Sequence, residues 1–157
     1  MRKDFSTGLI VIAVLAIVGL AVFYVIIPNL PQSKLTLRLG DGVFTASVAM
    51  DNASRTKGLS GTTELKSDQA LIMAFPTSDK WGIWMKDMNY PIDIVWLDAN
   101  KHVVDVFLGA TPDKPDVIHK PRLNATFVVE FSAGTVVDKN ITFDKTAIFE
   151  INTADIK

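Results

Sequence analysis

Two hydrophobic patterns divide the chain. Residues 8–27 form an uninterrupted apolar run, whereas beyond residue 33 short apolar stretches alternate with polar and turn-forming residues. At about 1.5 Å per residue, the run is long enough to cross a bilayer core of roughly 30 Å, and we expect a transmembrane helix there. A cleavable signal peptide is the alternative, but its apolar core usually has about 7 to 15 residues and ends in small residues. The bulky end, Phe-Tyr-Val-Ile-Ile-Pro, favours a retained anchor.

Charge predicts the orientation of this anchor. Arg2 and Lys3 precede the apolar run, and the first cation after it is Lys34. Because positive residues remain on the cytoplasmic side, we expect residues 1–7 in the cytoplasm, residues 8–27 in the bilayer, a linker over 28–33 and an extracytoplasmic domain over 34–157. Six linker residues reach only about 20 Å, so the domain would work close to the membrane.

Beyond the linker, period-two alternation predicts short strands. Residues 35–50 indicate a hairpin turning at Asp41-Gly42, and residues 51–58 a short helix with Asp51 as N-cap and Gly58 as C-cap. Further strands are expected at 70–75, 82–86, 92–98, 103–109, 125–131 and 146–151. This pattern predicts a mainly β domain, a sandwich or a barrel, with one short helix.

The segment WGIWMKDMNYPID, residues 81–93, concentrates aromatic and charged side chains. If 82–86 and 92–97 pair as an antiparallel hairpin, one face is wholly apolar, and the other carries Trp84, Lys86 and Asp93. Lys86 would then lie diagonally from Asp93, within reach of an ion pair. Either this is a surface ion pair packed on a tryptophan, or it is a polar site beside an aromatic platform. The apolar face would comprise Trp81, Ile83, Met85, Ile92, Ile94 and Trp96.

Composition excludes some partners. Without Arg2, Lys3 and Asp4, the 16 basic and 17 acidic side chains leave a net charge of about −2. That is no electrostatic footprint for nucleic acid. The chain has no cysteine, which excludes cysteine nucleophiles.

Several motifs of the soluble part resemble the domain-of-unknown-function 192 family, whose pattern includes R-x-x-G-L, F-W-M-K-N-T, P-L-D and V-L-E-x-x-A-G. The likeness covers about residues 35–151 and implies a compact β-sandwich-like domain, often secreted or membrane-tethered, with no established enzyme activity. Its motifs here are Arg55 to Leu59, Trp84-Met85-Lys86, Pro91 to Ile94, and Phe127 to Glu130 with Ala133-Gly134.

This chain departs from the family pattern mainly at turns and packing positions. The family's K-N-T is Lys86-Asp87-Met88 here, and the methionine after the G-L pair is Ser60. The polar and aromatic residues that match are Arg55, Trp84, Lys86, Asp93 and Glu130. If the family shares a polar site, the resemblance implies these five. Glu130 alternates with Phe127, Val129 and Phe131, so it need not be buried.

Other chemistry has weaker support. No G-x-S-x-G motif accompanies the two histidines, and His119 in a proline-broken loop lacks a second ligand at helical spacing, so neither a serine triad nor a metal site is expected. Asp93 and Glu130 are the only carboxylates we nominate as an acid and base pair. No cofactor is expected.

The sequence therefore predicts a single-pass anchored β-domain that binds an envelope component or a partner protein, with Arg55, Trp84, Lys86 and Asp93 as ligand-binding residues. An envelope hydrolase or transferase using Asp93 and Glu130 is one alternative. A structural accessory of a membrane assembly is another. The lipid bilayer is the expected partner of residues 8–27.

Overall fold

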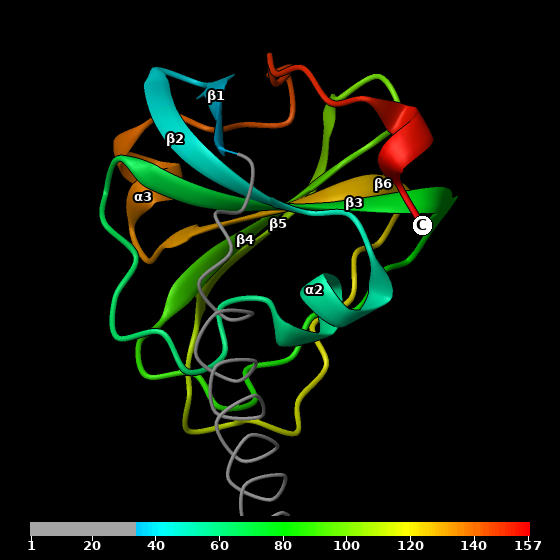
Figure 1. Ribbon diagram of the computed structural model, residues 1–157. Coiled ribbons are helices and arrows are strands. Elements are labelled where there is room, and N and C mark those ends of the chain that lie inside the picture. Colours follow the sequence, from blue (N-terminus) through cyan, green and yellow to red (C-terminus); the bar gives the residue numbers. More distant parts are fainter. Residues whose placement is uncertain (1–33) are drawn as a thin grey trace, which may run out of the picture. The chain divides into compact units, whose positions relative to one another are not determined.

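A computed structural model describes residues 34–157. They form one six-stranded sheet with a hydrophobic cluster on each face (Figure 1). The strands lie in the order β1-β2-β3-β6-β4-β5. Their bounds are β1 Lys34–Leu39, β2 Gly42–Ala49, β3 Gln69–Asp79, β4 Ile92–Leu97, β5 Val103–Ala110 and β6 Ala125–Ser132. The helical elements are α2 Asn52–Lys57, α3 Thr135–Asp138 and the 3₁₀ turn η2 Thr153–Asp155.

One strand pair is parallel and explains the position of α2. β2 pairs with β3 in parallel, whereas the other neighbouring strands pair antiparallel. A parallel pair needs a crossover of a dozen or more residues, and residues 50–68, which include α2, provide it. β6 then inserts between β3 and β4, so the last strand in the chain occupies the middle of the sheet.

Both faces of the sheet are buried. The larger hydrophobic cluster includes Leu37, Phe44, Val95, Val129 and Phe131, and the smaller one contains alternate residues of the same strands, from Leu71 and Met73 to Ile94 and Trp96. In Figure 1, α2, the loop before β4 (residues 80–91) and the loop after β5 (residues 111–124) lie below the sheet. The segment after α3, orange to red, runs largely above it. Strands covered on both faces are apolar throughout, and all six residues of β4 are buried.

The mainly β fold with one short helix is confirmed. The expected sandwich or barrel is not found, because the strands form one open sheet. All six strands belong to one sheet. The segment expected as a strand at 146–151 forms only isolated bridges, Arg38 with Ile148 and His102 with Thr146. Single bridges do not make a continuous ladder between the edge strands β1 and β5, so the sheet is not closed into a barrel.

The first hairpin and helix are confirmed with a small shift. β1 pairs with β2 from Lys34–Ser47 to Leu39–Gly42, which puts the turn at Gly40 and Asp41 rather than at Asp41 and Gly42. Gly40 has φ 56° and therefore suits the left-handed position of that turn.

The hairpin expected between residues 82–86 and 92–97 is wrong. β4 pairs with β5 and β6, and Ile83 forms an isolated bridge with His119 instead. The predicted apolar face is nevertheless right, because its six side chains all pack in or against the smaller cluster. Asp87 lies in the turn that starts at Lys86. Its φ is 56°, a left-handed conformation that Asp and Asn tolerate better than most residues.

The expected transmembrane helix 8–27 and linker 28–33 lie outside the described residues. Within residues 34–157, no helix is both long and apolar enough to cross a membrane.

Candidate functional site

A cavity of about 440 Å³ opens on the face of the sheet that carries the smaller cluster. Small-molecule sites are commonly clefts of about 300–1,000 Å³ with mainly apolar walls and a few polar groups, and this cavity fits that description. Five parts of the chain line it: α2 with the turn after it, the middle of β3, two loop segments around Trp84 and Ile118, and β6. The residues are Asn52, Arg55, Thr56, Lys57, Gly58, Leu59, Ser60, Met73, Phe75, Pro76, Trp81, Gly82, Ile83, Trp84, Met88, Ile118, Lys120 and Glu130.

The helix wall begins with a capping box. The Asp51 carboxylate accepts a hydrogen bond from the Ser54 backbone N–H at 2.9 Å, and the Ser54 hydroxyl accepts one from the Asp51 N–H at 3.2 Å. This arrangement satisfies backbone donors that a helix start otherwise leaves unpaired. α2 ends at Lys57, and its C-cap Gly58 has φ 49°. The Gly58 Cα faces Met73, because an added Cβ would lie 3.0 Å from the Met73 Cε.

Arg55 projects from α2 into the cavity wall. Its guanidinium donates hydrogen bonds to the Ala74 carbonyl oxygen at 2.7 Å, to the Asn52 side-chain oxygen at 2.6 Å and to the main-chain oxygen of Lys157. The same group lies 5.1 Å from the centre of the Phe75 ring, a cation–π distance. Burial lowers the pKa of Arg55, but a guanidinium stays charged at any physiological pH.

A second part of the wall is a short two-segment ribbon. Ile83 and His119 exchange backbone hydrogen bonds at 2.9 and 2.8 Å, and alternate residues on either side of this pair line the cavity: Gly82, Trp84, Ile118 and Lys120. Gly82 leaves room for Ile118, because an added Cβ would lie 2.5 Å from the Ile118 Cγ2. Trp84 remains 45% exposed and so presents its ring at the surface.

Glu130 provides the buried acidic group of the cavity. It lies on the central strand β6, with Leu71 and Ile94 opposite it on the two neighbouring strands, and is 3% exposed. Within residues 34–157, nothing forms a hydrogen bond or an ion pair with its carboxyl group. Desolvation by burial raises the pKa of Glu130 from 4.5 to about 8, so the side chain is mostly protonated at neutral pH.

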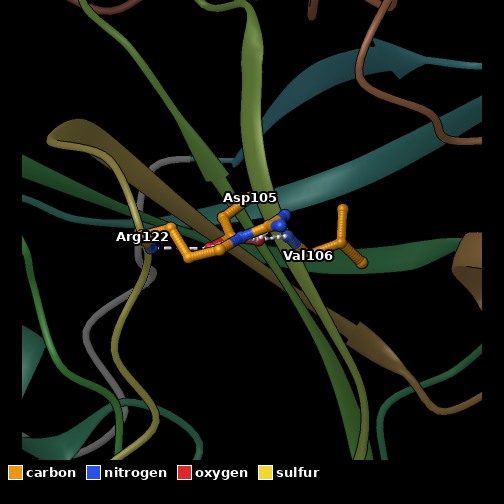
Figure 2. Close-up of polar contacts among 3 residues, drawn as sticks. All are labelled: Asp105, Val106 and Arg122. Carbon is orange, nitrogen blue, oxygen red and sulfur yellow. Dashed lines mark hydrogen bonds and ion pairs between the residues drawn. The ribbon is translucent and has the colours of Figure 1, made fainter.

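An ion pair between the buried Asp105 and the exposed Arg122 fixes the loop that carries Ile118 and Lys120. Figure 2 shows Arg122, which belongs to the same loop, bound to Asp105 of β5. The Asp105 carboxylate accepts from the Arg122 backbone N–H at 2.6 Å and from its guanidinium at 2.8 Å, and it also accepts from the Val106 N–H at 3.0 Å. Burial alone would raise the pKa of Asp105, but the hydrogen bonds from Arg122 and Val106 outweigh it and lower the pKa.

Two turns hold Trp84 in place from the other side. The Ser60 hydroxyl donates to the Lys86 carbonyl oxygen at 2.7 Å, and the Thr62 and Tyr90 hydroxyls lie 2.7 Å apart. The turn after α2 is thus attached to the loop between β3 and β4, although they are separated in sequence. The cavity walls form from these long-range contacts.

The structure brings together three of the five matching residues. Arg55, Trp84 and Glu130 line the cavity, whereas Lys86 and Asp93 do not. The expected ion pair between Lys86 and Asp93 is absent: the pairs found in residues 34–157 are His102–Asp98, Arg122–Asp105 and Lys145–Asp144. Lys86 is exposed, because its segment does not pair with β4.

Asp93 binds the backbone instead of facing a ligand. It is 1% exposed, and its two oxygens accept hydrogen bonds from the Gly109 N–H at 2.9 Å and the Val136 N–H at 3.0 Å. These contacts connect β4 to the end of β5 and to the start of α3.

Asp93 and Glu130 do not form a pair of catalytic carboxyls. Asp93 stands opposite Phe131 in the ladder, and Glu130 stands opposite Ile94, so their side chains leave opposite faces of the sheet. The two carboxyl groups therefore share no cleft.

Sequence reasoning missed most of the cavity wall. Phe75, Ile118, Lys57 and Lys120 were not candidates, because they come from three separate segments that no local spacing connects. It also placed Trp81 only in an apolar face. In the described part of the chain, no group of three or more His, Asp or Glu side chains is arranged to hold a metal ion.

Comparison with solved structures supports the fold. A candidate transcription regulator from Sinorhizobium meliloti superposes with a TM-score of 0.73 at 21% identity, covering 77% of this chain and 97% of that one. A protein of unknown function from Novosphingobium aromaticivorans superposes with a TM-score of 0.67 at 21% identity, covering 73% and 83%. At this identity the likeness concerns the fold alone.

Comparison with protein families identifies the chain. The search of curated proteins found no match. The sequence profile of DUF192, described as "Uncharacterized ACR", matches residues 35–148, nearly all of the described domain. The chain therefore belongs to the DUF192 family, as its motifs had indicated.

Proposed function

We propose that this protein is a binding module that holds a small, largely apolar molecule in the cavity between α2 and the sheet. The observation that carries the proposal is the buried Glu130 carboxyl, which lines the cavity without a hydrogen-bond partner in residues 34–157. Among the described residues, the one fully enclosed side-chain atom without a partner is His119 Nε2, whereas the Glu130 carboxyl borders the open space of the cavity. A ligand or water in that space can complete its hydrogen bonding.

The walls of the cavity suit such a ligand. Phe75 and Trp81 stack with ring centres 4.2 Å apart, and Trp84 presents a partly exposed ring beside them. Aromatic side chains provide large, rigid contact areas at low entropic cost. Arg55 adds a fixed polar group, because its hydrogen bonds hold the guanidinium in one position.

The proposal includes the membrane location expected from the sequence. The apolar run 8–27, with Arg2 and Lys3 before it, supports a single-pass anchor with a cytoplasmic N-terminus and an extracytoplasmic binding domain. A reporter that is active only outside the cytoplasm, fused after Lys157, should be active. An expressed but inactive fusion would contradict this orientation.

Ligand-induced stabilisation tests the binding function. We expect compounds from a chemically broad fragment library to raise the melting temperature of the protein, since a ligand at one hundred times its Kd stabilises the folded state by about 2.7 kcal/mol. Trp84→Ala should reduce these shifts. Val137→Ala, at an exposed apolar residue that does not line the cavity, should leave them unchanged.

Two results would contradict the binding function. One is a library without any compound that stabilises the protein. The other is a set of stabilising compounds whose shifts Trp84→Ala and Val137→Ala change equally.

A further inference from the structure

The charges around the cavity indicate the class of its ligand, an inference that depends on the binding function proposed above. Three cations, Arg55, Lys57 and Lys120, line the cavity, and among its described lining residues Glu130 is the single acid. No Asp or Glu side chain in residues 34–157 forms an ion pair with any of the three cations. The electrostatic complement of such a lining is an anion.

The buried acid does not cancel this preference. Because Glu130 is almost fully buried between apolar strands, desolvation favours its neutral form. A protonated carboxyl has an O–H group, which can donate a hydrogen bond to an anionic oxygen. An ammonium ligand would instead have to approach three cations and force Glu130 to ionise.

The remaining residues that line the cavity favour a ligand with an apolar body. Met73 and Phe75 come from β3 and Trp84 and Ile118 from the ribbon, and only Trp84 and Ile118 are substantially exposed. A hydrophilic anion such as inorganic phosphate would leave these surfaces without contacts. Apolar area removed from water contributes about 25 cal/mol per Å², so a ligand that covers it is favoured.

We propose that the cavity binds an amphipathic monocarboxylate, with its apolar body against Met73, Phe75, Trp84 and Ile118 and its carboxylate beside Arg55, Lys57 and Lys120. Arg55 is held on the cavity wall by its bonds to Ala74 and Asn52. Lys57 of α2 and Lys120 of the loop between β5 and β6 both line the cavity, and their side chains make no hydrogen bond within residues 34–157. They are therefore available to a ligand carboxylate.

Three probes that differ only in the polar group test this class. The full chain in phosphatidylcholine nanodiscs is titrated with 4-phenylbutyrate, 4-phenylbutan-1-ol and 4-phenylbutylammonium, with empty nanodiscs as the blank. Tryptophan fluorescence is the signal, because two of the three tryptophans line the cavity. The carboxylate should bind about tenfold more tightly than the other two, as expected for one charge-assisted hydrogen bond.

Variants place the anion in the cavity. Lys57→Gln with Lys120→Gln should weaken carboxylate binding about threefold to tenfold and leave the alcohol unchanged, since charged partners discriminate only the charged probe. Lys114→Gln, an exposed lysine of the same loop that does not line the cavity, is the matched control. Trp81→Phe with Trp84→Phe leaves Trp96 as the sole tryptophan and should abolish the signal.

The outcomes separate this inference from the binding function. Tighter binding of the alcohol or the ammonium probe overturns the carboxylate class while the cavity remains a binding site. An equal effect of the Lys114 control overturns the placement of the anion. No response to any probe overturns the inference, and the broad library screen then decides separately whether the cavity binds other molecules.

Discussion

The raised pKa of Glu130 predicts that the fold loses stability as the pH rises. In the interval from 4.5 to about 8, the folded protein holds the Glu130 proton and the unfolded chain does not. Unfolding then releases a proton, so the free energy of unfolding falls by about 1.4 kcal/mol per pH unit. Over the whole interval the loss amounts to about 5 kcal/mol, and at pH 7 it is about 3 kcal/mol. This is opposite in sign to the effect of a carboxylate with a lowered pKa.

Glu130→Gln isolates this effect. Gln has nearly the same shape and is neutral at every pH, so it removes the titration and retains polar groups facing the cavity. We expect the variant to gain stability over the wild type as the pH rises, by about 1.4 kcal/mol per unit between pH 5 and 8. The measurement is urea unfolding of residues 34–157 by tryptophan fluorescence, since the sheet and both hydrophobic clusters lie within this range.

The difference between the two pH profiles cancels the titration of all other groups. Glu150→Gln, at an exposed glutamate, is the control and should follow the wild type. If the wild-type and Glu130→Gln profiles run parallel, the Glu130 carboxyl is not kept neutral by burial, and the reasoning about the buried acid fails.

Three further substitutions test the framework of the cavity, each by urea unfolding. Asp93→Asn should destabilise the fold by about 1–3 kcal/mol, because one of the backbone N–H groups of Gly109 and Val136 loses its acceptor. An unchanged midpoint would contradict the backbone role. Asp105→Asn should cost a similar amount of stability by loosening Arg122. Because the pKa of Asp105 is lowered, the stability difference between wild type and variant should shrink as the pH falls through and below 3.8. A difference that does not depend on pH would contradict this role of Asp105. Gly82→Ala should lower the stability by about 1–3 kcal/mol and reduce ligand-induced stabilisation, because its Cβ displaces Ile118. Unaltered stability and binding would contradict close packing of Gly82 against Ile118.

Local pattern predicted which side of the sheet each residue faces, but not its strand partner. The alternation from Ile92 to Leu97 assigns Ile94 and Trp96 to one hydrophobic cluster and Val95 to the other, as observed. The same pattern was wrong about pairing, because β6 inserts beside β4 from far along the chain. Strand order depends on contacts between distant segments, to which a period of two residues is insensitive.

The candidate site shows the same division. All five polar and aromatic residues were nominated through the family motifs, and Arg55, Trp84 and Glu130 do line one cavity. The expected meeting of Trp84, Lys86 and Asp93 depended on a hairpin that does not form, so Lys86 and Asp93 lie elsewhere.

The amino-acid sequence by itself determined the β-rich class, the hairpin and helix near the start of the domain, the face on which each strand residue lies, and membership of DUF192. These follow from interactions between residues close in the chain, or from motif spacing. Only the tertiary structure decided that both faces of the sheet are covered. Glu130 therefore became a buried neutral acid rather than a surface carboxylate. The physical reason is desolvation: a side chain's charge state depends on what packs over it, and here α2 and two distant loops provide that cover.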